Sequence, residues 1–331
     1  MKRVHLMRHS RRLIVGSAGG TNAFGTIESV RERYGDGVFV VAIDTGRREL
    51  TAASVLADAF VQVPLARAPE FPEALRNVAK SYPGSYYLPL HDEEIEVAAR
   101  LAAEGSLPPG LELIAPPYDV VRLCNDKWEM DRWLREKDLP APETAPASAA
   151  ALAQMQLPAI LKPRKGTGGA GIRTINDAAE LKNVDPSHWL LQETLQAPDV
   201  SVNMFLGRRT TAFRCVCREC FEKRGSVETK MRIFHDPALA RLAERLAREL
   251  KLFGASNFEL LRDAAGRWRI IDVNPRVGAS ARMIAAVGLD FAAANLADFW
   301  DEPTDALLPP LEGEAYVVRQ FANYVTTAPL T

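Results

Sequence analysis

The sequence lacks several features that would define whole classes of protein. No apolar run reaches the roughly 18–20 residues that a membrane-spanning helix needs. The basic stretch MKRVHLMRHSRRL at the N-terminus has no apolar core of the kind that a secretory signal requires. Lysine plus arginine number 41 against 42 aspartate plus glutamate, so no excess charge favours nucleic acid or an anionic membrane. We therefore expect a cytoplasmic protein without nucleic-acid or membrane partners.

Cysteine is also scarce, with four among 331 residues. Cys215, Cys217 and Cys220 form a C-x-C-x-x-C pattern, which raises the question of a zinc or iron–sulfur site. Such a site wants a fourth ligand at suitable spacing, but Cys124 is far away in sequence and His235 is the only nearby histidine. We expect reduced cysteines on a strand, without disulfides in a cytoplasmic protein.

The first third of the chain alternates short apolar segments with helical patterns. RLIVGS, GVFVVAID, ADAFVQVP and YYLPL read as strands, and the first helix between them is expected from Thr26 to about Tyr34. Strands that alternate with helices at this spacing predict a parallel sheet with helices on both faces. The fold class is therefore α/β, with an α+β C-terminal half. We expect domains at residues 1–120, 121–194 and 195–331.

Two later helices carry end signals. One is expected from about 125 to 137, with Asn125 or Asp126 as its N-cap and prolines just past its end. The other follows Asp236, has a proline at its first position and bears a stripe of leucines. Gly254 is placed to form its C-terminal cap. A final helical region, SARMIAAVGLDFAAANLADFW, precedes a proline-containing tail.

The stretch PAILKPRKGTGGAGIRTI contains a G-x-G-x-x-G pattern at Gly166, Gly168 and Gly171. A dinucleotide-binding fingerprint needs such glycines between a strand and a helix. The segment after Gly171 is IRTIN, which is β-branched, has no helical stripe and ends in a turn. The loop is therefore expected to join two antiparallel strands, which excludes the dinucleotide interpretation. A Walker A loop is excluded as well, because no Gly-Lys-Ser/Thr follows.

Two lysines favour a phosphate ligand for this loop. Lys162 lies on the strand that leads into the loop, and Lys165 lies at its tip. Backbone amides of a glycine-rich loop can fold over phosphates, and the ammonium groups would supply the counter-charge for a triphosphate. The alternative is an ordinary glycine-rich hairpin with solvated lysines.

Acidic and amide side chains cluster near the C-terminal end, in NFELL and RIIDVNPRVGAS. Asp272 and Asn274 are two residues apart, so a strand would place them on one face together with Ile270. Glu259 lies on the partner strand of a predicted hairpin, and oxygen ligands on adjacent strands suit Mg²⁺. Arg276, just beyond, offers a planar donor for a phosphoryl oxygen. The alternative is a surface hairpin in which Asp272 pairs with a nearby arginine.

In their joint order and spacing, these motifs resemble the ATP-grasp superfamily, and within it the carbamoyl-phosphate-synthase-like branch. NDKWEMDRWLREKDLPAPET is similar to the first lysine helix of that family, and PAILKPRKGTGGAGI is similar to its second-lysine strand and flexible glycine loop. The resemblance covers nearly the whole chain. It implies an N-terminal parallel-sheet pre-ATP-grasp domain followed by the two-lobed ATP-grasp fold.

The resemblance also implies which residues bind ATP. LLQETL is similar to the linker strand that contacts adenine, with Glu193 by the exocyclic amine and the Thr194 and Leu195 backbone as further partners. Asp199 stands where the family binds the ribose hydroxyls, more often with glutamate. The residues implied to contact the phosphates are Lys127, Lys162, Lys165, Gly166, Gly168, Gly169 and Gly171.

The implied metal and catalytic residues follow from the same motifs. Glu259, Asp272 and Asn274 correspond to ligands of Mg²⁺, with Mn²⁺ as an alternative ion. The family more often has glutamate at the position of Asp272. Arg276 is implied to lie near the reacting phosphate and, with Lys162, to assist phosphoryl transfer.

The implied activity is that of an ATP-dependent carboxylate–amine ligase. A small-molecule carboxylate takes the γ-phosphate of ATP, and an amine or similar nucleophile then attacks the acyl phosphate, which releases ADP and phosphate. Such transfer needs mostly positioning and charge neutralisation, and no Ser–His–Asp or Cys–His set is evident. Two alternatives remain, namely an enzyme that forms carbamoyl or carboxy phosphate, and a non-catalytic nucleotide-binding protein.

Four residues are candidates for contacts with the substrate. Arg214, Lys230 and Arg232 are candidates to hold a substrate carboxylate, although they could equally form a solvated face. Ser280 lies in a loop that would contribute substrate contacts. The resemblance also suggests a homodimer.

Overall fold

The structure is a computed structural model that describes residues 11–326 apart from 167 and 226. The basic segment 1–10 considered above lies outside the described residues. The chain forms two compact units. Among the described residues, the N-terminal unit holds 11–118 together with Val277–Pro309 and 320–326, and the central unit holds Asp119–Arg276 and Pro310–Arg319. The division into 1–120, 121–194 and 195–331 stays a prediction, and it differs from this grouping at 277–309 and at 320–326.

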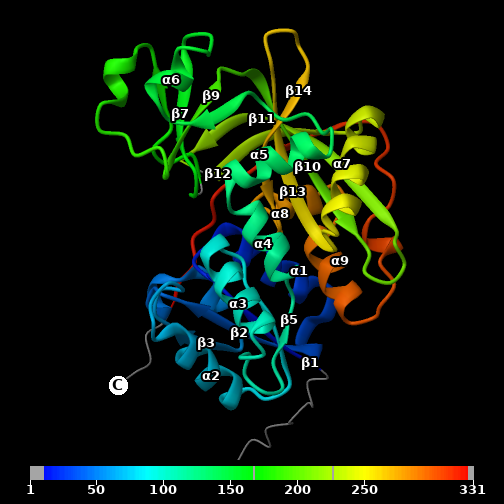
Figure 1. Ribbon diagram of the computed structural model, residues 1–331. Coiled ribbons are helices and arrows are strands. Elements are labelled where there is room, and N and C mark those ends of the chain that lie inside the picture. The colour runs from blue at the N-terminus through cyan, green and yellow to red at the C-terminus, as the bar shows by residue number, and fades with distance from the viewer. Residues whose placement is uncertain (1–10, 167, 226, 327–331) are drawn as a thin grey trace, which may run out of the picture. The chain divides into compact units, whose positions relative to one another are not determined.

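The N-terminal unit contains a five-stranded sheet in the order β3-β2-β1-β4-β5 (Figure 1). All four pairings in this sheet are parallel. Its elements are β1 (Arg11–Val15), α1 (Thr21–Tyr34), β2 (Val38–Asp44), β3 (Ala59–Gln62), α2 (Phe71–Ser81), β4 (Ser85–Leu88), α3 (Asp92–Ala103), β5 (Glu112–Leu113), α8 (Ala281–Ala285) and α9 (Phe291–Phe299). The parallel sheet predicted from the alternating pattern is confirmed.

Apolar side chains on both faces of this sheet are buried. Ile14 and Tyr87 belong to a core with residues of α2 and α3, while Leu13, on the opposite face of β1, is also fully buried. Helix α1 packs against α8 and α9, and a Cβ on Gly25 would lie 2.7 Å from the Cβ of Arg282. Helix α1 begins at Thr21, five residues before the predicted start, because the helix follows the SAGG turn directly.

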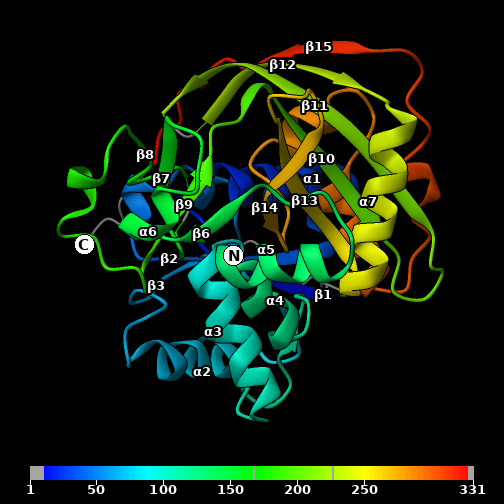
Figure 2. The same cartoon turned by 45° about the horizontal axis from the view of Figure 1, so that its top comes forward.

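The central unit is built on two sheets and four α-helices of the described chain. Its elements are α4 (Tyr118–Cys124), α5 (Lys127–Glu136), β6 (Thr144–Pro146), α6 (Ala149–Leu152), β7 (Ala159–Pro163), β8 (Arg173–Ile175), β9 (Trp189–Glu193), β10 (Gln196–Leu206), β11 (Phe213–Arg224), β12 (Val227–Phe234), α7 (Pro237–Leu250), β13 (Gly254–Arg262), β14 (Trp268–Asn274) and β15 (Ala315–Val318). The larger sheet has the order β14-β13-β10-β11-β12-β15, and the smaller sheet has the order β6-β9-β7-β8 (Figure 2). All their pairings are antiparallel. The predicted α/β fold with an α+β C-terminal half is therefore confirmed.

Helix α7 packs along one face of the larger sheet (Figure 2). Leu239 and Leu246 of this helix share a buried core with Val202 and Phe258 of the strands. The Asp236 side chain accepts hydrogen bonds from the first turn, as expected for its N-cap. The predicted C-terminal end is wrong, because Lys251, and not Gly254, adopts the left-handed conformation that ends α7.

The hairpin of β13 and β14 contains an irregularity that the sequence did not reveal. Glu259 lies opposite Asp272, but the next pair joins Leu260 to Ile270, so Ile271 is an extra residue in β14. Such a bulge resets the alternation of faces. Ile270 therefore packs in the core under α7 instead of sharing the face of Asp272, as strict alternation would have placed it.

Within residues 11–326, leaving aside 167 and 226, no helix combines the length and the apolar character that crossing a membrane would require.

Candidate functional site

The glycine loop joins β7 to β8, and these strands pair in antiparallel fashion, with Leu161 opposite Arg173. The strand–loop–strand arrangement that excluded a dinucleotide fingerprint is confirmed. Gly166, Gly168, Gly169 and Gly171 all have φ between 66° and 142°, a range that other residues rarely adopt. The loop conformation thus requires glycine, which keeps its backbone amides uncovered by side chains.

Lys162 is a buried lysine with its side chain directed away from the core of the small sheet. Its neighbour Leu161 belongs to that core, and strand alternation turns Lys162 to the other face, where it is 5% exposed. The pKa of Lys162 is lowered to about 8, chiefly by burial and in part by the nearby charge of Lys127, while Asp272 and Asp131 oppose the shift. An anion bound between the two lysines would relieve this unfavourable concentration of positive charge.

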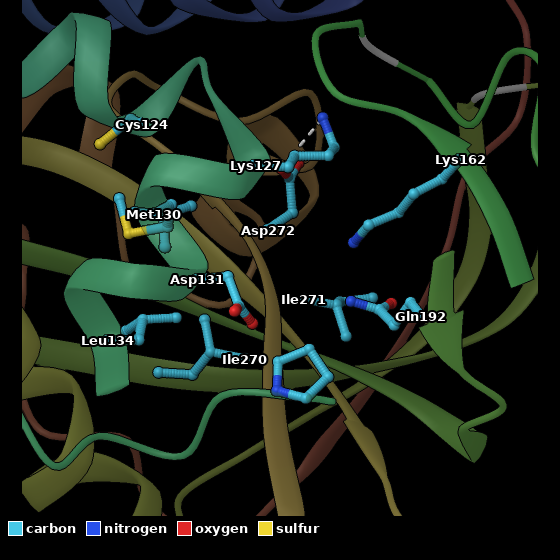
Figure 3. A pocket seen from close by; sticks show the side chains of 12 residues that line it. Cys124, Lys127, Met130, Asp131, Leu134, Lys162, Gln192, Ile270, Ile271 and Asp272 are labelled. Atoms are coloured by element: carbon cyan, nitrogen blue, oxygen red, sulfur yellow. Dashed lines mark ion pairs between the residues drawn. The ribbon is translucent and has the colours of Figure 1, made fainter. Parts of the chain in front are cut away.

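Lys127 connects the loop, helix α5 and strand β14. It is the first residue of α5, whose N-cap Asp126 accepts hydrogen bonds from two backbone N–H groups. The Lys127 ammonium donates to the carbonyl oxygen of Gly166 at 2.7 Å and lies 3.6 Å from a carboxylate oxygen of Asp272 (Figure 3). Lys165 is exposed in the loop itself.

A pocket lies between α5, β7, β9 and β14 in the central unit. Figure 3 shows Lys162 pointing into it from β7, while Asp131 and Asp272 point into it from α5 and β14. The lining thus combines two lysines and two carboxylates with an amide and an apolar wall. The lining residues are Cys124, Lys127, Met130, Asp131, Leu134, Pro142, Lys162, Gln192, Ile270, Ile271, Asp272 and Val273.

The predicted metal ligands lie together on the face of β13 and β14 that is opposite to α7. Glu259 faces Asp272 across the hairpin, and the Asn274 amide donates to Asp272 at 3.3 Å. Burial raises the pKa of Glu259 to about 7, and repulsion from Asp272 adds to the shift. The Arg276 guanidinium donates to the Asn274 side-chain oxygen at 3.3 Å, which brings it to the same edge.

This donor set fits a hard divalent cation, because two carboxylates and an amide oxygen are the ligand types that Mg²⁺ accepts. A cation between Glu259 and Asp272 would remove their mutual repulsion. Among the described residues, no cluster of three or more histidine, cysteine, aspartate or glutamate side chains is arranged to hold a metal ion. The assignment of Glu259, Asp272 and Asn274 as ligands therefore stays a prediction.

Several polar residues of this face were missed by the sequence analysis. Ser201 and Asn203 of β10 lie opposite Glu259 and Asn257 of β13, and they are buried. Arg218 of β11 is also buried, and its Nε donates to the Asn203 side chain at 3.1 Å. The period of two along a strand could have pointed to these residues. Asn257 lies two residues before Glu259 on β13, and Asn203 lies opposite Asn257 on β10.

The same sheet also contains a buried ion pair. The Arg218 guanidinium donates to the carboxylate of Glu228 on β12, and both side chains are buried. Burying one charge without the other is costly, so each residue requires its partner. No local sequence signal shows that these two charged residues lie inside the sheet.

The residues expected near adenine and ribose have structural partners of their own. Glu193 ends β9, and its carboxylate accepts a hydrogen bond from the backbone N–H of Glu143 at 2.8 Å. The Thr194 hydroxyl donates to the carbonyl of Pro158, and Leu195 follows before β10 begins. Asp199 pairs with Lys223 at 2.5 Å. Their roles toward a nucleotide stay predictions.

The candidate substrate residues are spread over the larger sheet and beyond. Lys230 pairs with Glu222 at 2.7 Å, and Arg232 pairs with Glu219 at 2.7 Å. Arg214 donates to the carbonyl of Phe213 at 2.9 Å. Ser280 belongs to the N-terminal unit and is buried there. The substrate roles of these four residues stay predictions.

Cys215, Cys217 and Cys220 lie on β11, a strand as expected. Cys215 and Cys217 border the core under α7, where burial raises the pKa of each thiol to about 12. Thiols with raised pKa values are poor nucleophiles and poor metal ligands. Cys124, Cys215, Cys217 and Cys220 are free of disulfides.

Comparison with known proteins places this site in a family. Residues 124–280 match the family model for the ATP-grasp domain, a range that contains the glycine loop, both lysines and the acidic hairpin. Residues 124–280 are therefore an ATP-grasp domain, and the superfamily predicted from the motifs is confirmed.

Solved structures with the same fold cover most of the chain. N5-carboxyaminoimidazole ribonucleotide synthetase from Thermotoga maritima superimposes with a TM-score of 0.68 at 15% identity, covering 89% of this chain and 77% of its own. The biotin carboxylase domain of the 2-oxoglutarate carboxylase from Hydrogenobacter thermophilus, crystallised as a dimer with MgADP, ADP and bicarbonate, gives 0.72 at 18% identity over 92% and 73%. L-Amino acid ligase from Bacillus licheniformis gives 0.66 at 15% identity over 87% and 74%.

One curated relative matches a smaller part of the chain. An uncharacterized protein of Mycoplasma genitalium is 26% identical over 93 residues, which are 27% of this chain and 32% of that protein. The match thus spans about a third of the relative's length. At these identities the structural likeness shows the fold alone.

Proposed function

We propose that this protein is an ATP-dependent ligase that joins a small-molecule carboxylate to an amine or similar nucleophile through an acyl phosphate, with release of ADP and phosphate. The proposal rests on one observation. Two lysines line the same pocket, and one of them contacts both the glycine loop and Asp272 of the acidic hairpin. The likeness of the fold to an amino acid ligase and to a carboxylase domain solved with MgADP supports it.

In this proposal, the chain contributes positioning and charge neutralisation. Lys127 and Lys162 hold the phosphates, and the amides of Gly168 and Gly169 cover them from above. The ammonium groups stabilise the charge that develops on the transferring phosphoryl group, and Arg276 adds a planar donor at the edge of the acidic hairpin.

Glu259, Asp272 and Asn274 would hold Mg²⁺, or Mn²⁺ in its place, and the bound ion would neutralise phosphate charge. The hairpin presents its carboxylates opposite each other, so their positions depend on the register of β13 and β14. Ser201 and Asn203 pack beside them and keep the face polar.

A second candidate is an enzyme that activates bicarbonate to carboxy phosphate. The carboxylase domain with bound bicarbonate has the same fold, which is the observation that favours it. The two candidates share the ATP site and differ in the acceptor. A homodimer is also proposed, by analogy with the dimeric carboxylase domain.

The test begins with calorimetric titration of the protein with ATP in the presence of Mg²⁺. Binding is expected for the wild type, whereas Lys162→Met should weaken it by at least 10-fold, about 1.4 kcal/mol, because a buried ammonium is lost from the phosphate side of the pocket. Lys80→Met, which removes an exposed lysine of α2, is the matched control and should bind as the wild type does. NAD should not bind.

Absence of Mg-ATP binding to the wild type would refute the proposal. Where ATP binds, release of ADP and phosphate is measured across a panel of amino acids and small carboxylates, and separately with bicarbonate. Release that requires an amino acid supports the ligase, and release that requires bicarbonate supports the second candidate. Binding without turnover in either panel leaves a nucleotide-binding protein.

A further inference from the structure

Arg164 lies where the glycine loop leaves β7, two residues after Lys162 and two residues before Gly166. Its Nε donates to both carboxylate oxygens of Asp126, at 2.8 and 2.9 Å. Its NH2 group also donates to Glu129 at 3.3 Å. These contacts join the origin of the loop to the first turn of α5, a segment almost forty residues earlier in the chain.

Backbone hydrogen bonds also connect the start of the loop to the start of α5. The N–H of Lys127 donates to the carbonyl oxygen of Arg164 at 3.0 Å, and the N–H of Arg164 donates to the carbonyl of His188 at 2.8 Å. The side chain of Arg164 is therefore hydrogen-bonded to Asp126, the residue before Lys127, and its backbone carbonyl is hydrogen-bonded to Lys127 itself. The position of the Lys127 Cα is fixed from two sides.

Asp126 has a double role at this point. Its carboxylate caps α5 by accepting from the N–H groups of Trp128 and Glu129, at 3.1 and 3.2 Å. It also accepts from Arg164 and is 6% exposed. Burial alone would raise the pKa of Asp126, but the hydrogen bonds from Arg164 and from the two backbone groups lower it overall. The carboxylate is thus held ionised where the helix and the loop meet.

We propose that Arg164 and Asp126 form a clamp that positions Lys127 and fixes the start of the glycine loop, so that Arg164 acts on nucleotide binding through Lys127. This inference rests on the proposed function, because it concerns the same ATP site. Arg164 is a positioning residue, since its guanidinium is occupied by Asp126 and Glu129. Lys127 makes the contact with Gly166 and Asp272, and it can do so only from the position that the clamp sets.

The test is a double-mutant cycle on the dissociation constant of Mg-ATP, measured by equilibrium dialysis up to millimolar nucleotide. The four proteins are the wild type, Arg164→Met, Lys127→Met and the double variant. Arg164→Met should weaken binding about 10-fold in the wild-type background, which corresponds to about 1.4 kcal/mol. In the Lys127→Met background the same change should alter binding less than 2-fold, because the residue through which Arg164 acts is gone.

Two further variants sharpen the cycle. Asp126→Asn keeps an efficient N-cap but removes the carboxylate that holds Arg164, so it should reproduce the Arg164→Met loss, and it replaces that variant if Arg164→Met does not fold. Arg173→Met removes an exposed arginine from β8, at the other end of the same loop, and should bind Mg-ATP like the wild type.

Equal losses from Arg164→Met in both backgrounds would overturn the clamp and leave the proposed function intact. An unchanged dissociation constant in the Arg164→Met and Asp126→Asn proteins would overturn it as well. A wild type that binds no Mg-ATP would overturn both the proposed function and the clamp.

Discussion

At the scale of single residues, Glu94 in α3 shows how a buried carboxyl group constrains its neighbours. Its two oxygens accept hydrogen bonds from the hydroxyls of Ser17 and Tyr87, at 2.6 and 2.5 Å. A Cβ on Gly16 would lie 2.0 Å from a Glu94 oxygen, so any other residue at this position would have to displace the Glu94 carboxylate. Burial raises the pKa of Glu94 to about 7, although the hydroxyl donors favour the ionised form.

This shift predicts how stability depends on pH. The folded state holds the Glu94 proton more tightly than the unfolded state does, where the pKa is about 4.5. The stabilisation is therefore fully present below about pH 4.5 and is lost as the pH rises through about 7. Relative to Glu94→Gln, we expect the free energy of unfolding of the wild type to fall by up to about 3 kcal/mol between pH 5 and pH 8, as measured by urea denaturation.

The control for this measurement is Glu93→Gln, since Glu93 is next along α3 and its side chain is 47% exposed. That variant should follow the wild-type profile. If the difference between the wild type and Glu94→Gln is the same at both pH values, Glu94 does not titrate in this range in the folded protein.

Residue types were easier to predict than residue environments. Lys162 and Asp272 were identified as chemically meaningful from their local spacing, next to a glycine loop and within a predicted hairpin, and the resemblance to the ATP-grasp superfamily added Lys127. Nothing in the sequence indicated that Glu94 or Arg218 is buried, since burial depends on side chains that lie far away in the sequence. Arg218, for example, is paired through Glu228 of the next strand.

At the scale of elements, the segments with strong local signals formed as predicted. The β-branched run after Gly171 became β8, and the segments around Glu259 and Asp272 became a hairpin. The start of α7 was predicted from Asp236 and the following proline. Such signals operate within a few residues, so they can be recognised without knowledge of the fold.

The end of α7 was predicted wrongly, and the error gives a test. Lys251 closes the helix with φ 53° and ψ 43°, a conformation that costs a non-glycine residue free energy. We expect Lys251→Gly to raise the free energy of unfolding by about 0.5–1 kcal/mol, measured by urea denaturation at pH 7.

The matched control is Lys182→Gly, because Lys182 closes a short 3₁₀ helix with φ −51° and gains nothing from glycine. It should leave stability unchanged or lower it slightly. A destabilised Lys251→Gly protein would mean that contacts of the lysine side chain outweigh the backbone cost.

The bulge at Ile271 shows a limit of reasoning from alternation. Strict alternation along β14 predicted Ile270 on the same face as Asp272. The extra residue in β14 instead turns the Ile270 side chain into the core beside Val273. Asp272 and Asn274 lie beyond the bulge, so their common face was predicted correctly. The register is set by core packing against β13 and α7, which the sequence of β14 alone does not contain.

At the scale of the whole molecule, residues 277–309 belong with the N-terminal unit and not with the strands that precede them. Helices α8 and α9 pack on α1, and Arg282 of α8 pairs with Glu28 and Glu32 of α1. The chain therefore leaves the N-terminal unit after α3 and β5, and returns to it after β14.

This grouping predicts the effect of truncation. A chain that ends at Arg276 lacks α8 and α9, so the buried face of α1 loses its cover. We expect amide hydrogens of β1 and β2 to exchange at least 10-fold faster than in the full chain, because local opening becomes easier. Strands β10 and β13 should keep their protection, since α7 and its core remain.

A full-length chain with Leu308→Ala, which trims one buried side chain of the N-terminal unit without removing a helix, is the control. It should show a smaller change confined to the same unit. Loss of protection in β10 and β13 with β1 unaffected would instead favour the predicted division that assigns 195–331 to one domain.

The sequence by itself determined the antiparallel strands around the glycine loop, the acidic hairpin and the ATP-grasp domain at residues 124–280. These depend on residue type and short spacing. Only the tertiary structure decided the burial of Lys162 and Arg218, the bulge at Ile271 and the unit to which α8 and α9 belong. Those features arise from packing between segments that are far apart in the chain, and packing energies are not encoded in any one segment.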